Sequence, residues 1–256
     1  MGGDYQRDRR GADSAPGRDR RVAAQAAQRS ERQAVADLRP GERGGGAPED
    51  RAGERSLHGR ACWQDCATLD PMPAIVAPSL SDGEIGVRPI VAGDIPAIVA
   101  ACADPEIPRW TRVPSPYTRE DAARFLVIAA SEAAAGEGAV LAVCEVAHDR
   151  LIGTVGLMEL DRRRGYAEIG YWIAAPARGR GTATRAVALL RDWAAGELGL
   201  AEIEIFAHRD NRPSQRVAER AGFTDTGTIR AVPRMPPDKR DGYKVYVWRA
   251  GDARPV

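Results

Sequence analysis

The spacing of apolar side chains changes repeatedly along the chain, and each change predicts a new element. Ile85 and Val87 occupy alternate positions within residues 84–91, a period typical of a strand. Thr118, followed three residues later by Asp121, is expected to begin a helix that runs to about residue 135. The core-facing positions of this helix have the i, i+3, i+4, i+7 spacing and are Ala122, Phe125, Leu126 and Ala129.

Strand and helix patterns alternate over the rest of this region. Residues 94–102 predict a short helix, and four prolines at positions 105, 108, 114 and 116 then predict a loop. The early strands follow one another through short turns, which predicts a mixed α/β (α+β) fold with mostly antiparallel neighbours. The further predicted strands are residues 139–147, 150–160, 166–174, 201–207, 223–229 and 243–248, and the further predicted helices are residues 181–196 and 213–221.

Residues 1–71 have a different composition from the rest of the chain. They contain 13 Arg and 12 acidic residues, and Tyr5 and Trp63 are their only Tyr, Trp or Phe residues. Burial of so little apolar surface does not offset the conformational entropy that the chain loses on ordering. We therefore expect a disordered N-terminal extension. A second hypothesis is that translation starts at Met72. The predicted organisation is therefore an extension over residues 1–71 and one domain over residues 72–256.

Charge and hydropathy exclude several classes of protein. The chain has 37 basic and 36 acidic residues, a balance that indicates neither a nucleic-acid partner nor an anionic membrane partner. No apolar run approaches the roughly 18 residues that a spanning helix needs. The first ten residues lack the apolar segment of a secretory signal. We therefore expect a cytoplasmic protein.

The four cysteines do not predict a metal site. Cys102 and Cys144 lie among apolar residues, as buried thiols do. His58, Cys62 and Cys66 are four residues apart, but a fourth zinc ligand is missing. No metal is therefore expected.

A glycine-rich turn joins the strand predicted at residues 166–174 to the long helix predicted at residues 181–196. Such a turn presents free backbone N–H groups at the positive end of a helix dipole, where phosphate or pyrophosphate binds. Its two glycines permit positive φ and close approach of a ligand. A tight connection that binds nothing is the alternative. The turn consists of Arg178, Gly179, Arg180, Gly181, Thr182 and Ala183.

Around this turn the sequence resembles the acetyl-CoA motif of the GNAT superfamily of N-acetyltransferases, Arg/Gln-x-x-Gly-x-Gly/Ala after a strand. Residues 211–223 resemble the second signature of that superfamily. Residues 116–122 resemble its RimJ/RimL-like branch, which acetylates the N-termini of ribosomal proteins. The likeness covers residues 84–249 and implies the GNAT fold. In that fold a mixed, mostly antiparallel sheet is flanked by helices and its two central strands splay apart, here residues 166–174 and 201–207.

The resemblance also implies a reaction, in which a primary amine attacks the thioester of acetyl-CoA directly within a ternary complex. The pyrophosphate is expected at residues 178–183, held by main-chain N–H groups with added charge from the two arginines. The pantetheine arm is expected between the splayed strands, in contact with Asn211. A backbone N–H of Ile173 or Ala174 is expected to polarise the thioester carbonyl.

Two side chains are expected to handle protons. Glu168 is the first candidate to deprotonate the ammonium, ahead of Glu145 and Glu159. Many members of the superfamily carry a Tyr where this chain has Ala218, whereas the RimJ/RimL-like branch uses a Ser that matches Ser214. A serine is a poor acid, so a relay through water is one role for it. The alternative for Glu168 is a carboxylate that faces solvent or pairs with an Arg. The alternative for Ser214 is a hydroxyl that bonds local backbone.

The sequence leaves the acceptor open between the α-amine of a protein N-terminus and a small-molecule amine. Residues 104–117 and 230–241 are expected to determine it, because such loops vary freely on one scaffold. No nucleic-acid or membrane partner is expected, and the chain is expected to be a monomer or a homodimer. The absence of the usual tyrosine at Ala218 also keeps open a second class of function, a non-catalytic acyl-CoA-binding sensor domain.

Overall fold

A computed structural model describes residues 72–251, which belong to one compact unit. The extension predicted over residues 1–71 and the potential zinc ligands within it lie outside the described residues. Within residues 72–251, none of the helices has both the length and the apolar character to cross a membrane.

A single eight-stranded sheet forms the centre of the fold, with the strand order β1-β2-β3-β4-β5-β6-β8-β7. Neighbouring strands are antiparallel except β5 and β6, which are parallel. This confirms the predicted mixed, mostly antiparallel sheet, although the short strand β1 was not predicted. The strands are β1 (Leu80–Ser81), β2 (Ile85–Pro89), β3 (Ala139–Glu145), β4 (Arg150–Asp161), β5 (Tyr166–Ile173), β6 (Glu202–His208), β7 (Thr224–Arg230) and β8 (Tyr243–Arg249).

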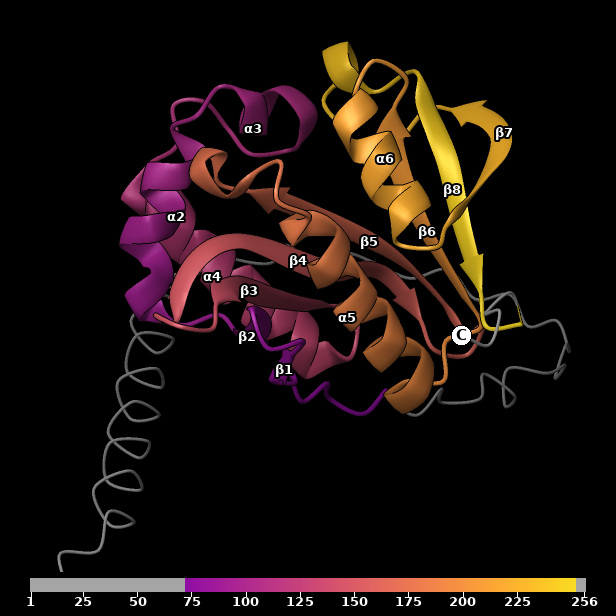
Figure 1. The fold of residues 1–256 in the computed structure, drawn as a ribbon, viewed down its shortest axis with the longest axis horizontal. Helices are drawn as coiled ribbons and strands as arrows, with labels where there is room; N and C mark the ends of the chain where they lie inside the picture. Colours follow the sequence, from indigo (N-terminus) through magenta and orange to yellow (C-terminus); the bar gives the residue numbers. More distant parts are fainter. Residues whose placement is uncertain (1–71, 252–256) are drawn as a thin grey trace, which may run out of the picture. The chain divides into compact units, whose positions relative to one another are not determined.

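Helices cover both faces of the sheet, with α5 in front and α4 behind in the view of Figure 1. One apolar cluster joins the sheet to α5 and α6, and a second joins it to α2 and α4. The helices are η1 (Ala92–Asp94), α2 (Ile95–Cys102), α3 (Glu106–Trp110), α4 (Arg119–Ala135), η2 (Ala175–Ala177), α5 (Thr182–Glu197), α6 (Arg212–Arg220) and η3 (Pro237–Lys239).

Helix α4 begins where its sequence predicts. Thr118 accepts a bond from the Asp121 N–H, and the Asp121 carboxylate accepts one from the Thr118 N–H, so both ends of a capping box are present. Of the four predicted core positions only Ala122 and Ala129 are buried. Phe125 is half-buried because this end of α4 borders a cavity, which Phe125 lines.

The predicted proline-rich loop is partly wrong, because it contains the five-residue helix α3. Pro105 is the N-cap of this helix and Pro108 lies in its first turn. Proline is tolerated there, since the N–H groups of a first helical turn have no acceptor within the helix. The buried Ile107 anchors α3 to the same apolar cluster as α2 and α4.

The parallel pairing of β5 with β6 ends early. Only three pairs form, and the last joins Glu168 to Glu204. Beyond that pair the two strands diverge, as Figure 1 shows, and β6 pairs over its whole length with β8 on its other side. The result is the pair of splayed central strands implied by the resemblance, with a gap between them.

Strands β4 and β5 pack closely at Gly153. A Cβ added at Gly153 would overlap the Trp172 carbonyl oxygen and lie 2.7 Å from Cδ1 of Ile173. We expect Gly153→Ala to lower the free energy of unfolding by about 1–3 kcal/mol, as overpacking does. Urea denaturation measures the change.

The matched control for this substitution is Gly196→Ala. Gly196 lies within α5, and a Cβ there meets nothing within 4 Å. The better helix propensity of alanine should raise the free energy of unfolding by roughly 0.5–1 kcal/mol. Equal stability of the two alanine variants would contradict the close approach at Gly153.

Candidate functional site

A cavity of about 740 Å³ lies at the gap between β5 and β6. Its walls come from these two strands, from α3 and α4, from the first turn of α5, from α6 and from the β7–β8 connection. The volume falls within the range of sites that hold cofactors and drug-sized ligands.

The glycine-rich turn lies at one end of this cavity. Gly179 and Gly181 have φ values of 76° and 80°, a region that side-chain-bearing residues rarely occupy. Neither glycine would meet a neighbour if it carried a Cβ, so the backbone conformation, and not packing, requires glycine here. Gly181 is the N-cap of α5, and Gly181, Thr182, Ala183 and Thr184 all line the cavity. The free N–H groups of the first helical turn therefore stand at the cavity wall.

The side chains of the turn hold its shape. Thr182 is buried, and its hydroxyl donates to the Ala177 carbonyl at 3.0 Å. The Arg178 guanidinium donates to the Ile173 carbonyl at 2.8 Å and pairs with Asp104 at 2.6 Å. Arg178 is therefore held by protein groups, and because it also lines the cavity, its expected role as added charge for phosphates stays a prediction. Arg180 is exposed and does not line the cavity.

Side chains on β5 alternate between the two faces of the sheet, and this separates the predicted proton-handling residues. Ile169 and Ile173 pack in the cluster beneath α5 and α6, whereas Trp172 packs with α2 and α4. By the same alternation Tyr171 faces α6, and Glu168 faces the side of α2 and α4. Glu168 and Ser214, which is on α6, thus approach the gap from opposite faces.

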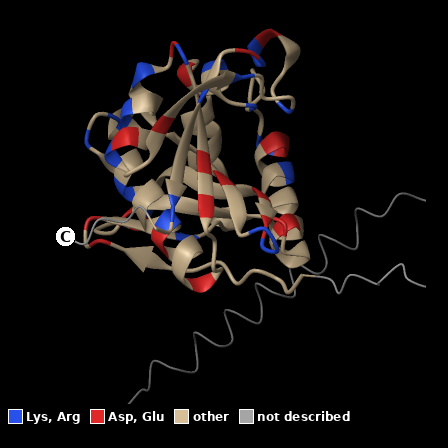
Figure 2. Cartoon of the chain, turned by 90° about the vertical axis from the view of Figure 1, so that its right-hand side faces the viewer, with Lys and Arg blue, Asp and Glu red and all other residues tan. Residues whose placement is uncertain are grey.

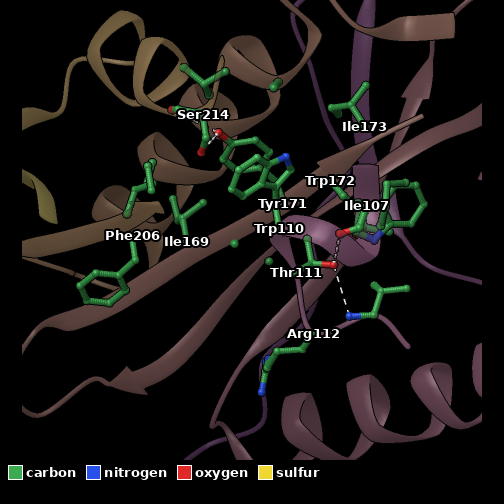
Figure 3. A pocket seen from close by; sticks show the side chains of 18 of the residues that line it. Ile107, Trp110, Thr111, Arg112, Ile169, Tyr171, Trp172, Ile173, Phe206 and Ser214 are labelled. Carbon is green, nitrogen blue, oxygen red and sulfur yellow. Dashed lines mark hydrogen bonds between the residues drawn. The ribbon is translucent and has the colours of Figure 1, made fainter. Parts of the chain in front are cut away.

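Ser214 is held by two neighbours. Its N–H donates to the Asn211 side chain at 3.1 Å, the N-cap bond of α6. Its hydroxyl lies 2.9 Å from the hydroxyl of Tyr171, and Figure 3 shows the two side chains turned toward each other. Burial raises the pKa of Tyr171 well above its usual range.

The two backbone donors proposed from the sequence differ in availability. The Ala174 N–H donates to the Ile152 carbonyl at 2.8 Å, so it belongs to the β4–β5 ladder. We therefore withdraw Ala174 as the carbonyl donor. In an antiparallel pair successive residues point their backbone groups to opposite sides, so the N–H groups of Ile173 and Tyr171 point toward the gap.

Glu168 forms an ion pair with an arginine, which is one of the alternatives that the sequence left open for it. It is 5% exposed and pairs with Arg234, from the β7–β8 connection, which also pairs with Glu159 at 3.1 Å. Burial lowers the pKa of Arg234, and the nearby Glu159 opposes that shift.

Residues 104–117 and 230–241, the segments expected to determine the acceptor, meet over the cavity. The Trp110 ring lies 5.5 Å from that of His208, and His208 makes an edge contact with Tyr243. Lys239 donates to the Pro108 carbonyl at 2.7 Å. These contacts connect α3 to the β6–β8 side of the gap.

A second cavity of about 590 Å³ adjoins the first and shares with it the walls formed by Arg112, Glu132 and Met158. Arginines 162–164 and the acidic residues Glu137, Glu159 and Asp161 also line it. Both signs of charge are therefore present, as they are across the side of the molecule seen in Figure 2.

Sequence reasoning missed Tyr171 and Arg234 as residues of the site. A signal for Tyr171 was available, because it alternates with Ile169 and Ile173 on the strand before the turn. No local pattern marks Arg234, which reaches Glu168 only through the fold.

The comparisons with known proteins agree with this geometry. The family model described as an acetyltransferase (GNAT) domain matches residues 84–224. The N-acetyltransferase p20 of Bacillus licheniformis is 29% identical over 129 residues, which is 50% of this chain and 72% of that protein.

Two solved structures share the fold. RimJ of Mycobacterium smegmatis, in complex with CoA-disulfide, has a TM-score of 0.61 at 19% identity and covers 72% of this chain and 91% of its own. The ribosomal-protein-S5-alanine acetyltransferase of Vibrio fischeri has a TM-score of 0.59 at 19% identity and covers 70% and 100%. With residues 84–224 matched by the family model and a cavity at the splayed strands, this chain belongs to the GNAT family of acetyltransferases and is an N-acetyltransferase that uses acetyl-CoA.

Proposed function

We propose that the enzyme transfers the acetyl group of acetyl-CoA to the N-terminal α-amine of a polypeptide, by direct attack within a ternary complex. The observation that carries this proposal is the gap between β5 and β6, which gives access to the same point from both faces of the sheet. Acetyl-CoA enters from the face of α5 and α6, and the amine enters from the face of α2 and α4.

Acetyl-CoA is proposed to bind along the gap. Its pyrophosphate accepts bonds from the N–H groups of residues 179–183, at the positive end of α5. Its pantetheine arm extends the sheet at the unpaired edge of β5, next to Asn211. The Ile173 N–H, which points toward the gap, is proposed to polarise the thioester carbonyl.

Glu168 is proposed to take the proton of the acceptor ammonium. It lines the cavity on the acceptor face, where its buried carboxylate pairs with Arg234. An incoming ammonium competes with the guanidinium for this carboxylate, so acceptor binding requires Arg234 to yield part of its ion pair. A peptide α-amine suits such a base, because its pKa of about 8 is lower than that of an alkyl amine.

A polypeptide acceptor is favoured over a small amine by the continuity of the two cavities. The first cavity reaches Glu168, and the second leads from the shared wall at Arg112 toward Arg162 and Arg164. An extended chain with its N-terminus at Glu168 fits this path. The V. fischeri protein with the same fold is named for acetylation of a ribosomal protein, which agrees with the proposal.

The turn is tested by Gly181→Glu. A glutamate places a negative charge at the expected pyrophosphate position and strains a backbone with φ of 80°, so we expect CoA affinity to fall at least about tenfold. Calorimetric titration with CoA measures the change. Gly251→Glu is the control, because it adds the same charge at an exposed position outside the cavity and should bind CoA normally. Equal CoA affinity in both variants would remove the turn from the site.

The base is tested by Glu168→Gln. Loss of the carboxylate should lower kcat by about 10²–10⁴-fold while CoA still binds. Glu202→Gln is the matched control, because Glu202 lies on β6, outside the cavity lining, and also loses an ion pair, with Arg249. A kcat for Glu168→Gln within about threefold of the control would assign proton removal to another group.

The acceptor is tested by thiol release from acetyl-CoA with a panel of N-terminal peptides, amino-acid amides and small alkyl amines. We expect the highest kcat/KM with peptides, because only they extend into the second cavity. Faster turnover of a small amine than of any peptide would overturn the polypeptide assignment. Binding of CoA without turnover across the panel would count against every acceptor named above.

A further inference from the structure

The Tyr171–Ser214 pair lies on the face of the gap from which acetyl-CoA is proposed to enter. The two hydroxyl oxygens are 2.9 Å apart, and both residues line the cavity (Figure 3). One helical turn beyond Ser214, Ala218 is fully buried and offers no hydroxyl. Tyr171, which lies on β5, places a phenol beside Ser214 instead.

Either hydroxyl can donate in this hydrogen bond. We assign Tyr171 as the donor and the Ser214 oxygen as the acceptor, because a phenol is a stronger acid than an alkyl alcohol. Burial raises the pKa of Tyr171, which therefore keeps its proton throughout the neutral range. Ser214 is thus left with its own O–H to donate.

That O–H has a restricted set of directions. The Ser214 N–H is fixed by Asn211 at 3.1 Å, and the Ser214 oxygen is occupied by Tyr171. Apart from the Tyr171 oxygen, the Ser214 hydroxyl has no protein partner within hydrogen-bond distance in the part of the chain that the structure describes. The remaining direction is into the cavity that both residues line.

We infer that Tyr171 is a positioning residue that aims the Ser214 hydroxyl at the sulfur of the leaving thiolate. This inference rests on the proposed function and concerns its last step. Glu168 first passes the ammonium proton to solvent. The neutral amine nitrogen then forms a bond to the carbonyl carbon, the proton that this nitrogen loses on amide formation passes to Glu168, and the C–S bond breaks with its electron pair moving to sulfur. Ser214 donates a hydrogen bond to that sulfur without giving up its proton, and the thiolate is protonated by water on release.

This role predicts that the two hydroxyls act as one unit. Ser214→Ala and Tyr171→Phe should each lower kcat by about tenfold to a hundredfold, the effect of one hydrogen bond to a charged group, while the KM for acetyl-CoA changes by less than about twofold. In the double variant kcat should equal that of Ser214→Ala, because Tyr171 acts only through Ser214. Steady-state kinetics on all four proteins with the best peptide acceptor measures the cycle.

The pH profile separates positioning from proton donation. The loss in Tyr171→Phe should be the same at every pH between about 6 and 9, because neither hydroxyl titrates there. A loss that changes with pH across this range would mean that the phenol titrates during turnover, and it would overturn the inference. CoA-induced heat stabilisation equal to that of the wild type verifies that each variant is folded.

Tyr246→Phe is the matched control, since Tyr246 is fully buried on β8 and lies outside the cavity lining. It should have the kcat of the wild type. Losses that multiply in the double variant, or a wild-type kcat in Tyr171→Phe, would overturn the positioning role. Both results are distinct from failure of the proposed function, which appears as a wild-type enzyme that turns over no acceptor.

Discussion

The end of the β5–β6 ladder at Glu168 and Glu204 is the constraint on which the site depends. Up to that pair the two strands share hydrogen bonds, and beyond it they share none. β6 pairs fully with β8, while β5 keeps β4 on one side and leaves backbone N–H groups open on the other. In a closed sheet those groups would be paired and a ligand would have nothing to bind.

This gap also separates the chemistry into two faces. The alternation of β5 directs Glu168 to the side of α2 and α4, and Tyr171 to the side of α6. In the proposed reaction the acceptor amine is therefore deprotonated on one side of the sheet, and the thiolate departs on the other.

Local patterns predicted the elements well, since periodicity and capping act over a few residues. Helix α4 begins at the capping box of Thr118 and Asp121, and Gly181 caps α5 as its turn predicted. The contacts of the site are not local. Arg234 meets Glu168 and Arg178 meets Asp104 through tertiary packing, which no period in the sequence encodes. The Ala174 N–H is not free to act as the donor, because the alternation of backbone groups along β5 directs it to β4. Residue type does not reveal this alternation.

The two bonds of Arg178 connect parts of the enzyme that belong to different ligands. Its guanidinium joins the Ile173 carbonyl, at the cofactor turn, to Asp104, at the start of the acceptor wall. The planar guanidinium group carries several N–H donors and makes both bonds at once. A lysine ammonium does not reproduce that geometry. A neutral residue in place of Asp104 would therefore remove one of the two bonds that hold Arg178 between the turn and the acceptor wall.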